Sequence, residues 1–183
     1  MVQIKQVGGG SRTGGGALAG LIASAVMLFA AMGWLSLAGL GFWTVPREVA
    51  AGVEGLPALL GGAGTVITGI CLFLATGVIL GIIYSWLALR IEAKKTSLLA
   101  GVVYSIGVWA VMTFAILPGL DPILRTRLAL LMGTWFWWHL VYGAMLFMTP
   151  ALRRGVAHRL EWQKPHVDLE SPGPTDYHLG KAS

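Results

Sequence analysis

Four long apolar stretches, separated by short polar segments, dominate the chain. Because a helix needs about 20 mostly apolar residues to cross a bilayer core about 30 Å thick, each stretch is long enough to span a membrane. None of the four contains Asp, Glu, Lys or Arg. The pattern predicts an all-α integral membrane protein, a bundle of four transmembrane helices at Ala17–Leu40, Gly64–Leu89, Ser97–Leu117 and Leu128–Met148.

Polar segments flank and connect these stretches, and they set the expected domain organisation. The N-terminal run "GGGSRTGGG" has the composition of a flexible linker. We therefore predict a flexible tail at 1–16, a transmembrane domain at 17–150 and a polar tail at 151–183. The first stretch exceeds the about 7–15 apolar residues of a signal-peptide core, so it is predicted to be a retained span.

Lys and Arg residues are distributed unevenly between the two sides of the predicted bundle. The first and third loops hold only Arg47, Arg125 and Arg127, and the rest of the 13 lie in the two tails and the second loop. Loops on the cytoplasmic side carry the excess of positive charge in membrane proteins. Both termini are therefore predicted to be cytoplasmic, in a bacterial inner membrane.

The composition excludes two other classes of protein. Charged residues make up 11% of the chain and hydrophobic residues 56%, whereas soluble domains carry about 25% charged residues. So few charges could not cover a water-facing surface. The net charge of +5 lies at the ends of apolar stretches, which indicates membrane orientation and not nucleic-acid binding.

The first and third stretches share a sequence pattern. "AGLIASAVM" from Ala19 aligns with "AGVVYSIGVWAVM" from Ala100, and "FLATGVILG" from Phe73 aligns more weakly with "HLVYGAMLF" from His139. One interpretation is a duplication, with two helical hairpins in parallel orientation. The other is chance, because short apolar segments resemble one another easily.

Small residues recur at helical spacing within the stretches. Such spacing lets helix backbones approach closely in lipid, where apolar burial does not drive association. A glycine-lined pathway for a substrate is the alternative interpretation. The predicted packing positions are Gly20, Ser24, Gly77, Gly81, Gly101, Ser105 and Gly143.

His139 is the only histidine within a predicted span. A neutral imidazole at this depth could form a hydrogen bond with a neighbouring helix. It could instead ligate a haem, with a methionine as second ligand, or a chlorin, or it could carry protons. No catalytic set or metal cluster can be assembled within the spans, so we predict that the protein is not an enzyme. The expected hydrogen-bond partners are Ser24, Ser105, Thr113 and Tyr104.

Aromatic side chains and outer-loop charges offer candidate surfaces. Three tryptophans and a tyrosine around His139 are predicted to face lipid or a partner protein, namely Trp135, Trp137, Trp138 and Tyr142. On the outer side, opposite charges could pair between the first and third loops or form a docking surface. The residues concerned are Arg47, Asp121 and Arg125.

"GVVYSIGVWAVMTFAILP", followed by "WHLVYGAMLF", resembles the YagU-like group of small four-span bacterial inner-membrane proteins. The third span of that family ends at a proline, and the fourth carries a histidine followed by a Tyr-Gly step. "FWTVPREV" resembles the family's proline-arginine loop more weakly. The resemblance covers 17–148, and it implies a membrane location and four helices but no particular activity. Matching positions are Tyr104, Pro118, His139, Tyr142, Gly143 and Arg47.

Three functional hypotheses follow from these patterns. The leading one is a non-enzymatic accessory or structural subunit that packs with another membrane complex or with itself in the bilayer. The second is a haem- or chlorin-binding subunit for electron transfer or light harvesting, with His139 as the ligand. The third is a small permease or channel for a neutral solute.

Overall fold

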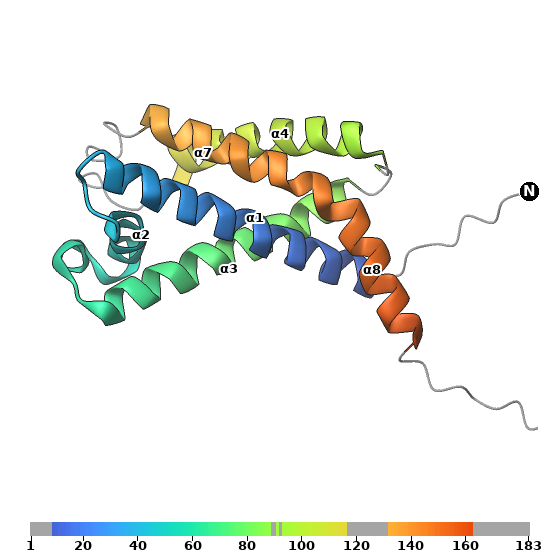
Figure 1. The fold of residues 1–183 in the computed structure, drawn as a ribbon, viewed down its shortest axis with the longest axis horizontal. Helices are drawn as coiled ribbons and strands as arrows, with labels where there is room; N and C mark the ends of the chain where they lie inside the picture. Colours follow the sequence, from blue (N-terminus) through green and yellow to red (C-terminus); the bar gives the residue numbers. More distant parts are fainter. Residues whose placement is uncertain (1–8, 89–90, 92, 117–131, 163–183) are drawn as a thin grey trace, which may run out of the picture.

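The computed structural model describes residues 9–88, 91, 93–116 and 132–162, and all statements of structure below refer to them (Figure 1). These residues form helices and turns, with no strand among them. The α-helices are α1 (Gly9–Leu37), α2 (Thr44–Glu54), α3 (Ala63–Leu87), α4 (Lys94–Val111), α7 (Met132–Met145) and α8 (Thr149–Trp162). Shorter helical turns are η1 (Leu56–Leu60), the π-helical η2 (Met112–Ile116) and η3 (Leu146–Met148).

Three of the helices are long and apolar enough to cross a membrane. They are α1, α3 and the continuous helix formed by α4 and η2, Lys94–Ile116. This agrees with an all-α membrane protein and with the first three predicted spans. The fourth predicted span corresponds to α7 and η3, of which the structure describes 132–148. Its first residues, 128–131, lie outside the described residues, so the fourth span stays a prediction.

The helix α1 begins at Gly9, within the predicted N-terminal tail. The prediction of a flexible segment is therefore wrong from Gly9 onward. Tertiary packing explains the difference. A Cβ at Gly15 would lie 2.7 Å from the Arg153 backbone of α8, and one at Gly16 would lie 2.6 Å from Cβ of Ser85 on α3. The glycines that suggested a linker have no side chains, so two other helices can contact the first turns of α1.

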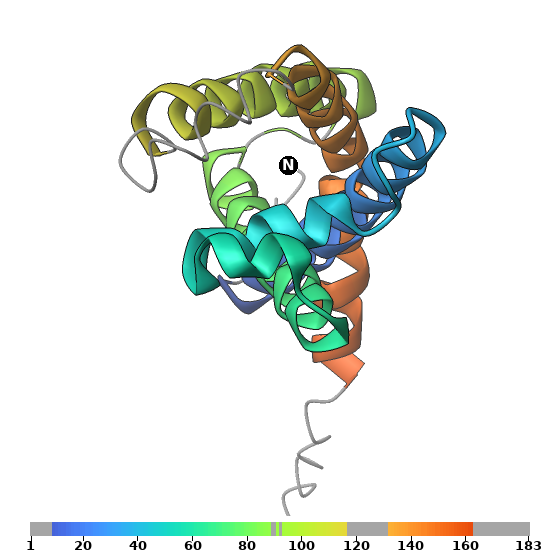
Figure 2. The same ribbon diagram turned by 90° about the vertical axis from the view of Figure 1, so that its left-hand side faces the viewer.

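Two pairs of helices pack with their backbones in close contact. In the first pair, a methyl group at Gly20 of α1 would collide with the carbonyl oxygen of Gly77 on α3. In the second pair, a methyl group at Gly101 of α4 would collide with the carbonyl oxygen of Gly143 on α7. Figure 2 shows the two pairs as separate layers, α1 with α3 and α4 with α7. The layers meet mainly along α1 and α7.

Three tyrosines join α3 to the second pair through hydrogen bonds to backbone carbonyls. The Tyr84 hydroxyl donates to the Ser97 carbonyl at 2.8 Å, and the Tyr104 hydroxyl donates to the Leu80 carbonyl at 2.9 Å. The Tyr142 hydroxyl of α7 donates to the Gly77 carbonyl, also at 2.9 Å. Each tyrosine therefore fixes the position of one layer relative to the other.

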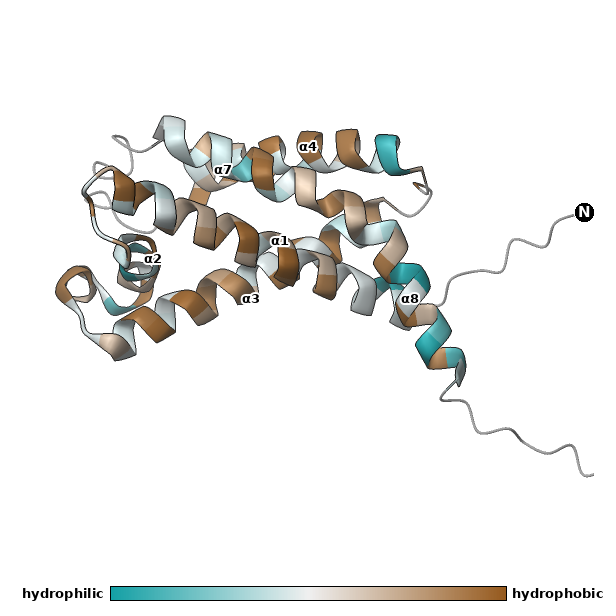
Figure 3. Cartoon of the chain, in the orientation of Figure 1, coloured by the Kyte–Doolittle hydropathy of each residue, from teal (hydrophilic) through white to brown (hydrophobic). Residues whose placement is uncertain are grey.

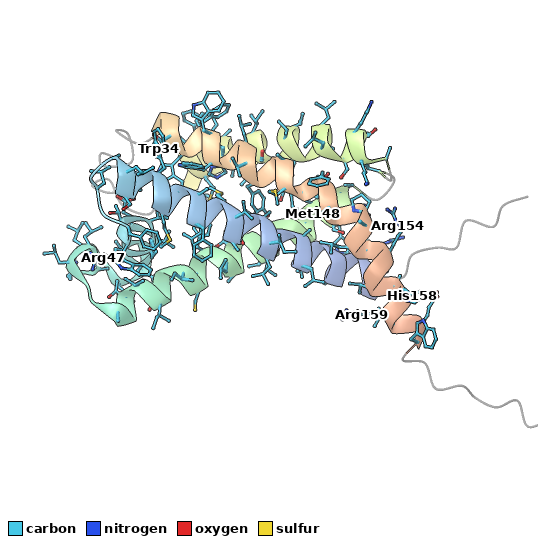
Figure 4. The ribbon with its side chains drawn as sticks, viewed as in Figure 1. Trp34, Arg47, Met148, Arg154, His158 and Arg159 are labelled. Carbon is cyan, nitrogen blue, oxygen red and sulfur yellow. The ribbon has the colours of Figure 1, made fainter. Side chains whose placement is uncertain are left out.

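Polar and apolar surfaces separate along the molecule. The bundle helices are mostly apolar, whereas α8 extends from one end and carries charged residues (Figure 3). Figure 4 shows Arg154, His158 and Arg159 on α8, far from Trp34 and Arg47 at the opposite end. The described charges therefore concentrate at the two ends of the bundle, as in a protein that crosses a bilayer.

The amphipathic helix α2 packs against the bundle at the end opposite α8. Val45, Pro46 and Ala50 are buried, and Pro46 lies against Gly69 of α3 so closely that a side chain at Gly69 would overlap its carbonyl. The first loop thus forms a cover over one end of α3. The inward packing of α2 depends on the glycine beneath it, Gly69.

Candidate functional site

A cavity of about 360 Å³ lies within the bundle and is lined by residues from α1, α2, α3, α4, η2 and α7. This volume is near the lower end of the range typical of small-molecule sites, about 300–1,000 Å³. Its walls are largely apolar. Besides Tyr142 and His139, three of the lining residues have aromatic side chains. The apolar lining includes Met27, Phe73, Leu80, Trp109, Met112 and Trp135.

His139 is partly buried on α7 and lines this cavity. Its Nδ1 lies 2.8 Å from the carbonyl oxygen of Trp135, one turn earlier on the same helix. A carbonyl oxygen only accepts, so Nδ1 carries the proton and donates, and Nε2 is left as a lone-pair acceptor. The partner is therefore in its own helix, which corrects the expected bond to Ser24, Ser105, Thr113 or Tyr104.

Three of the hydroxyl groups that line the cavity with His139 already donate to backbone carbonyls. Ser24 Oγ donates to the Leu21 carbonyl at 3.0 Å, and Thr76 Oγ1 donates to the Leu72 carbonyl at 2.8 Å. The Tyr142 hydroxyl donates to Gly77. No described residue forms a hydrogen bond with Nε2 of His139, so this atom is available to a molecule in the cavity.

The rim of the cavity lies between α3 and α4, at the end that α2 covers. Thr76 of α3, Gly52 of α2 and Ile116 of η2 all line the cavity and are exposed. α3 packs on α1 and α2, and α4 packs on α7, while the contacts between α3 and α4 are made by side chains, among them Tyr84 and Tyr104. The cavity therefore opens sideways, toward the lipid that would surround these two helices.

Outer-loop charge reaches the cavity through α2. Glu48 is among the lining residues, and Arg47 is the preceding residue on the same helix. The sequence patterns indicated loop charges here but not a place in a cavity wall. The signal that could have shown that α2 packs inward is the helical spacing of its apolar residues, among them the buried Val45, Pro46 and Ala50. Asp121 and Arg125 lie outside the described residues.

The aromatic residues predicted as one surface are divided between surface and interior. Trp137 is 65% exposed, whereas Trp135 and Trp138 are partly buried against the apolar core. Tyr142 is only 3% exposed, so its prediction as a lipid or partner surface is wrong. The helical repeat explains the split, because Trp137 faces away from the side of α7 that carries Trp138 and Tyr142.

The predicted packing positions all lie at contacts between helices. Each of the five glycines faces a neighbouring backbone or serine that a side chain would strike. Ser24 and Ser105 are buried opposite Gly77 and Gly143, with their Oγ atoms bonded to the carbonyls of Leu21 and Val102. These residues bring the helices together, and two of them, Ser24 and Gly77, also line the cavity.

A metal centre built from protein side chains is not found in the described part of the chain, which has no suitable group of three His, Cys, Asp or Glu residues. A single imidazole remains, and it suits one coordination bond or one hydrogen bond. Comparison with protein-family models, curated proteins and solved structures finds no match. The properties of the site therefore follow from its own geometry, and the YagU-like resemblance stays a prediction.

Proposed function

We propose that the chain is a four-span integral membrane protein that binds a small lipid-soluble molecule inside its bundle. The observation that carries this proposal is the apolar cavity lined by His139, whose Nε2 has no partner among the described residues. Trp109 also lines the cavity, and its Nε1 is buried with no hydrogen-bond partner among the described residues. A buried polar atom is costly when it lacks a hydrogen bond. A bound molecule would supply that bond and fill the space.

The rim between α3 and α4 supports a ligand that partitions into lipid. Two of its exposed lining residues, Thr76 and Ile116, lie on helices long and apolar enough to cross a membrane, so a molecule can enter from the bilayer. A water-soluble ligand would have to reach the cavity past α2. The proposed role is binding and not catalysis.

The same geometry weakens the accessory-subunit hypothesis without excluding a partner protein. One motivation for that hypothesis was a set of small-residue faces free to pack against another complex. In the structure Gly20, Gly77 and Gly81 contact one another across α1 and α3, and Gly101 contacts Gly143. These faces are occupied within the chain. Trp137 keeps the exposed surface that such a partner would use.

We also infer that the two hairpins are repeats. The pairs equated by sequence, Gly20 with Gly101 and Gly77 with Gly143, make the same contacts in each hairpin. Ser24 and Ser105 also correspond, because each donates to the carbonyl three residues earlier and faces the equivalent glycine. This correspondence supports α7 as the fourth span, in the role that α3 has in the first hairpin.

Co-purification of a ligand tests the proposed binding. Wild type, Val108→Phe and Val103→Phe would be isolated in mild detergent, and their extracts compared by mass spectrometry per mole of protein. Val108 lines the cavity, whereas Val103 lies on the same helix and is 62% exposed. The larger ring at position 108 occupies ligand space, so we expect a compound enriched with wild type and Val103→Phe but depleted with Val108→Phe.

Two results would oppose this function. One is the absence of any enriched compound from wild type, followed by no binding of added apolar molecules in nanodiscs. The other is equal retention of the compound by Val108→Phe, which would place it outside the cavity.

A further inference from the structure

We propose that the ligand is a lipid-soluble phenol or hydroquinone, an aromatic ring whose hydroxyl group donates to Nε2 of His139. This inference rests on the proposed binding function and specifies the chemical class. Three features of the cavity lead to it: the direction of the available hydrogen bond, the nature of the walls, and the size and opening of the space.

The hydrogen bond has a defined direction. Nδ1 of His139 donates to the Trp135 carbonyl, so in the neutral imidazole Nε2 carries the lone pair of a side chain that lines the cavity. The ligand must therefore bring a donor. A hydroxyl group satisfies this requirement and also offers an acceptor to the buried Nε1–H of Trp109. A ketone, an ester or an ether offers only acceptors and would leave Nε2 without a partner.

The walls suit an aromatic ring. Phe73, Trp109 and Trp135 contribute ring faces or edges, and aromatic pairs prefer offset or edge-to-face contacts. Met27 and Met112 add thioethers, which contact aromatic rings favourably. A flexible acyl chain would gain little from this combination of groups, whereas a phenol ring makes both kinds of contact.

Size and opening suggest a compact head with a longer tail. The volume of about 360 Å³ is small for a drug-sized ligand, so it favours a single-ring group over a tetrapyrrole enclosed by the protein. The rim at Thr76 and Ile116 gives an apolar tail a route from the cavity into lipid between α3 and α4. The proposed ligand is therefore anchored by its ring and solvated by the bilayer along its tail.

A matched pair of compounds tests the donor requirement without relying on any mutation. 4-Decylphenol and 4-decylanisole differ only in that the hydroxyl proton of one is replaced by a methyl group in the other. Both would be titrated into the full chain in nanodiscs of neutral phosphatidylcholine, and bound compound measured by native mass spectrometry. One hydrogen bond of ordinary net strength predicts about five- to tenfold tighter binding of the phenol.

The variant His139→Phe keeps a ring of similar size but removes the acceptor. We expect it to bind the two compounds about equally. As a matched control, His158→Phe changes an exposed histidine on α8 that is bonded to Trp162, and it should retain the preference for the phenol. Size-exclusion chromatography and helical circular dichroism establish that each variant is folded.

The outcomes separate this inference from the function on which it rests. Equal binding of phenol and anisole to wild type overturns the phenol class but leaves a binding protein for apolar molecules. A preference that persists in His139→Phe overturns the role of Nε2. A visible absorption band that disappears in His139→Phe indicates a tetrapyrrole and overturns the class, while failure of both compounds and of co-purification rejects binding altogether.

Discussion

Arg153 shows how one side chain can join segments that are distant in sequence. It is 6% exposed on α8, and its guanidinium donates to three carbonyls at and beyond the end of α3. The distances are 3.4 Å to Ser85, 3.0 Å to Ala88 and 3.3 Å to Ile91. The last carbonyls of a helix have no partner within it, so a cation at this end stabilises α3 and holds α8 beside it.

Replacement of Arg153 by methionine should therefore destabilise the folded bundle. The apolar stem is largely retained, but the carbonyls of Ser85 and Ala88 lose a charged donor. We expect a loss of about 1.5–3 kcal/mol in the free energy of unfolding, the range for hydrogen bonds to charged groups. Unfolding by denaturing detergent in mixed micelles, followed by circular dichroism, measures it.

Arg154→Met is the matched control, because Arg154 is the adjacent residue and is exposed. It should change the unfolding free energy by less than about 0.5 kcal/mol. Equal effects of the two substitutions would show that Arg153 acts through the general charge of α8 and not through its contacts with α3.

Helix packing depends on glycines whose surroundings differ sharply along one helix. A Cβ at Gly20 would meet the Gly77 carbonyl and lie 2.9 Å from Cα of Gly81, so backbone would have to move. A Cβ at Gly33, also on α1, would meet nothing within 4 Å. The same substitution therefore has opposite expected effects at the two positions.

Gly20→Ala should reduce stability by about 1–3 kcal/mol, the usual cost of forcing extra volume into a packed contact. Gly33→Ala should be neutral or stabilising by up to about 1 kcal/mol, because alanine favours a helix over glycine. The free energies of unfolding in mixed micelles compare them. A stable Gly20→Ala protein would mean that α1 and α3 are farther apart than described.

The second hairpin provides the corresponding pair of positions. A side chain at Gly143 would strike Ser105 and the Gly101 carbonyl, whereas Gly133 on the same helix is open. If the hairpins are repeats, Gly143→Ala should resemble Gly20→Ala, and Gly133→Ala should resemble Gly33→Ala. A small effect at Gly143 would indicate that the two hairpins only look alike.

At the scale of the whole molecule, the number of spans decides where α8 lies relative to the end of α1. With four spans, Ser36 and His158 are on opposite sides of the membrane. With α1, α3 and the α4–η2 helix alone, they are on the same side. Both residues are exposed, so each can be replaced by a labelled cysteine.

Cysteine labelling in bacterial cells measures this topology. The single natural cysteine, Cys71, is first changed to alanine so that the introduced thiol is the only one. A membrane-impermeant maleimide should label Ser36→Cys in intact cells and His158→Cys only after lysis. The reverse pattern would contradict cytoplasmic termini, and labelling of both in intact cells would contradict the fourth span.

The membrane class and much of the helix pattern could be predicted because they depend on local properties. An uncharged apolar stretch of about 20 residues must satisfy its backbone internally in lipid, and a helix does so without other parts of the chain. Small residues spaced four apart along a span also predict close contact. Gly20, Gly77, Gly101 and Gly143 could therefore be identified before their partners were known.

Long-range contacts determine the features that could not be predicted. The glycine-rich segment from Gly9 is helical because α8 and α3 pack against it, and no local preference indicates that. Tyr142 is buried because the Gly77 carbonyl lies within reach of its hydroxyl, on a helix 65 residues away in sequence. The cavity depends on six elements at once, including α2, whose inward packing requires Gly69 on α3.

Local structure determines which nitrogen of His139 carries the proton, and tertiary structure determines what surrounds the other nitrogen. Its helix makes the Trp135 carbonyl available to Nδ1, so the protonated nitrogen follows from two residues one turn apart. What Nε2 faces depends on how α1, α3 and α4 are placed around α7. The apolar and charged residues of the chain account for a helical membrane protein, because burial in lipid is a local requirement. The presence of an open cavity beside that imidazole, and hence the proposed ligand, depends on packing between distant helices.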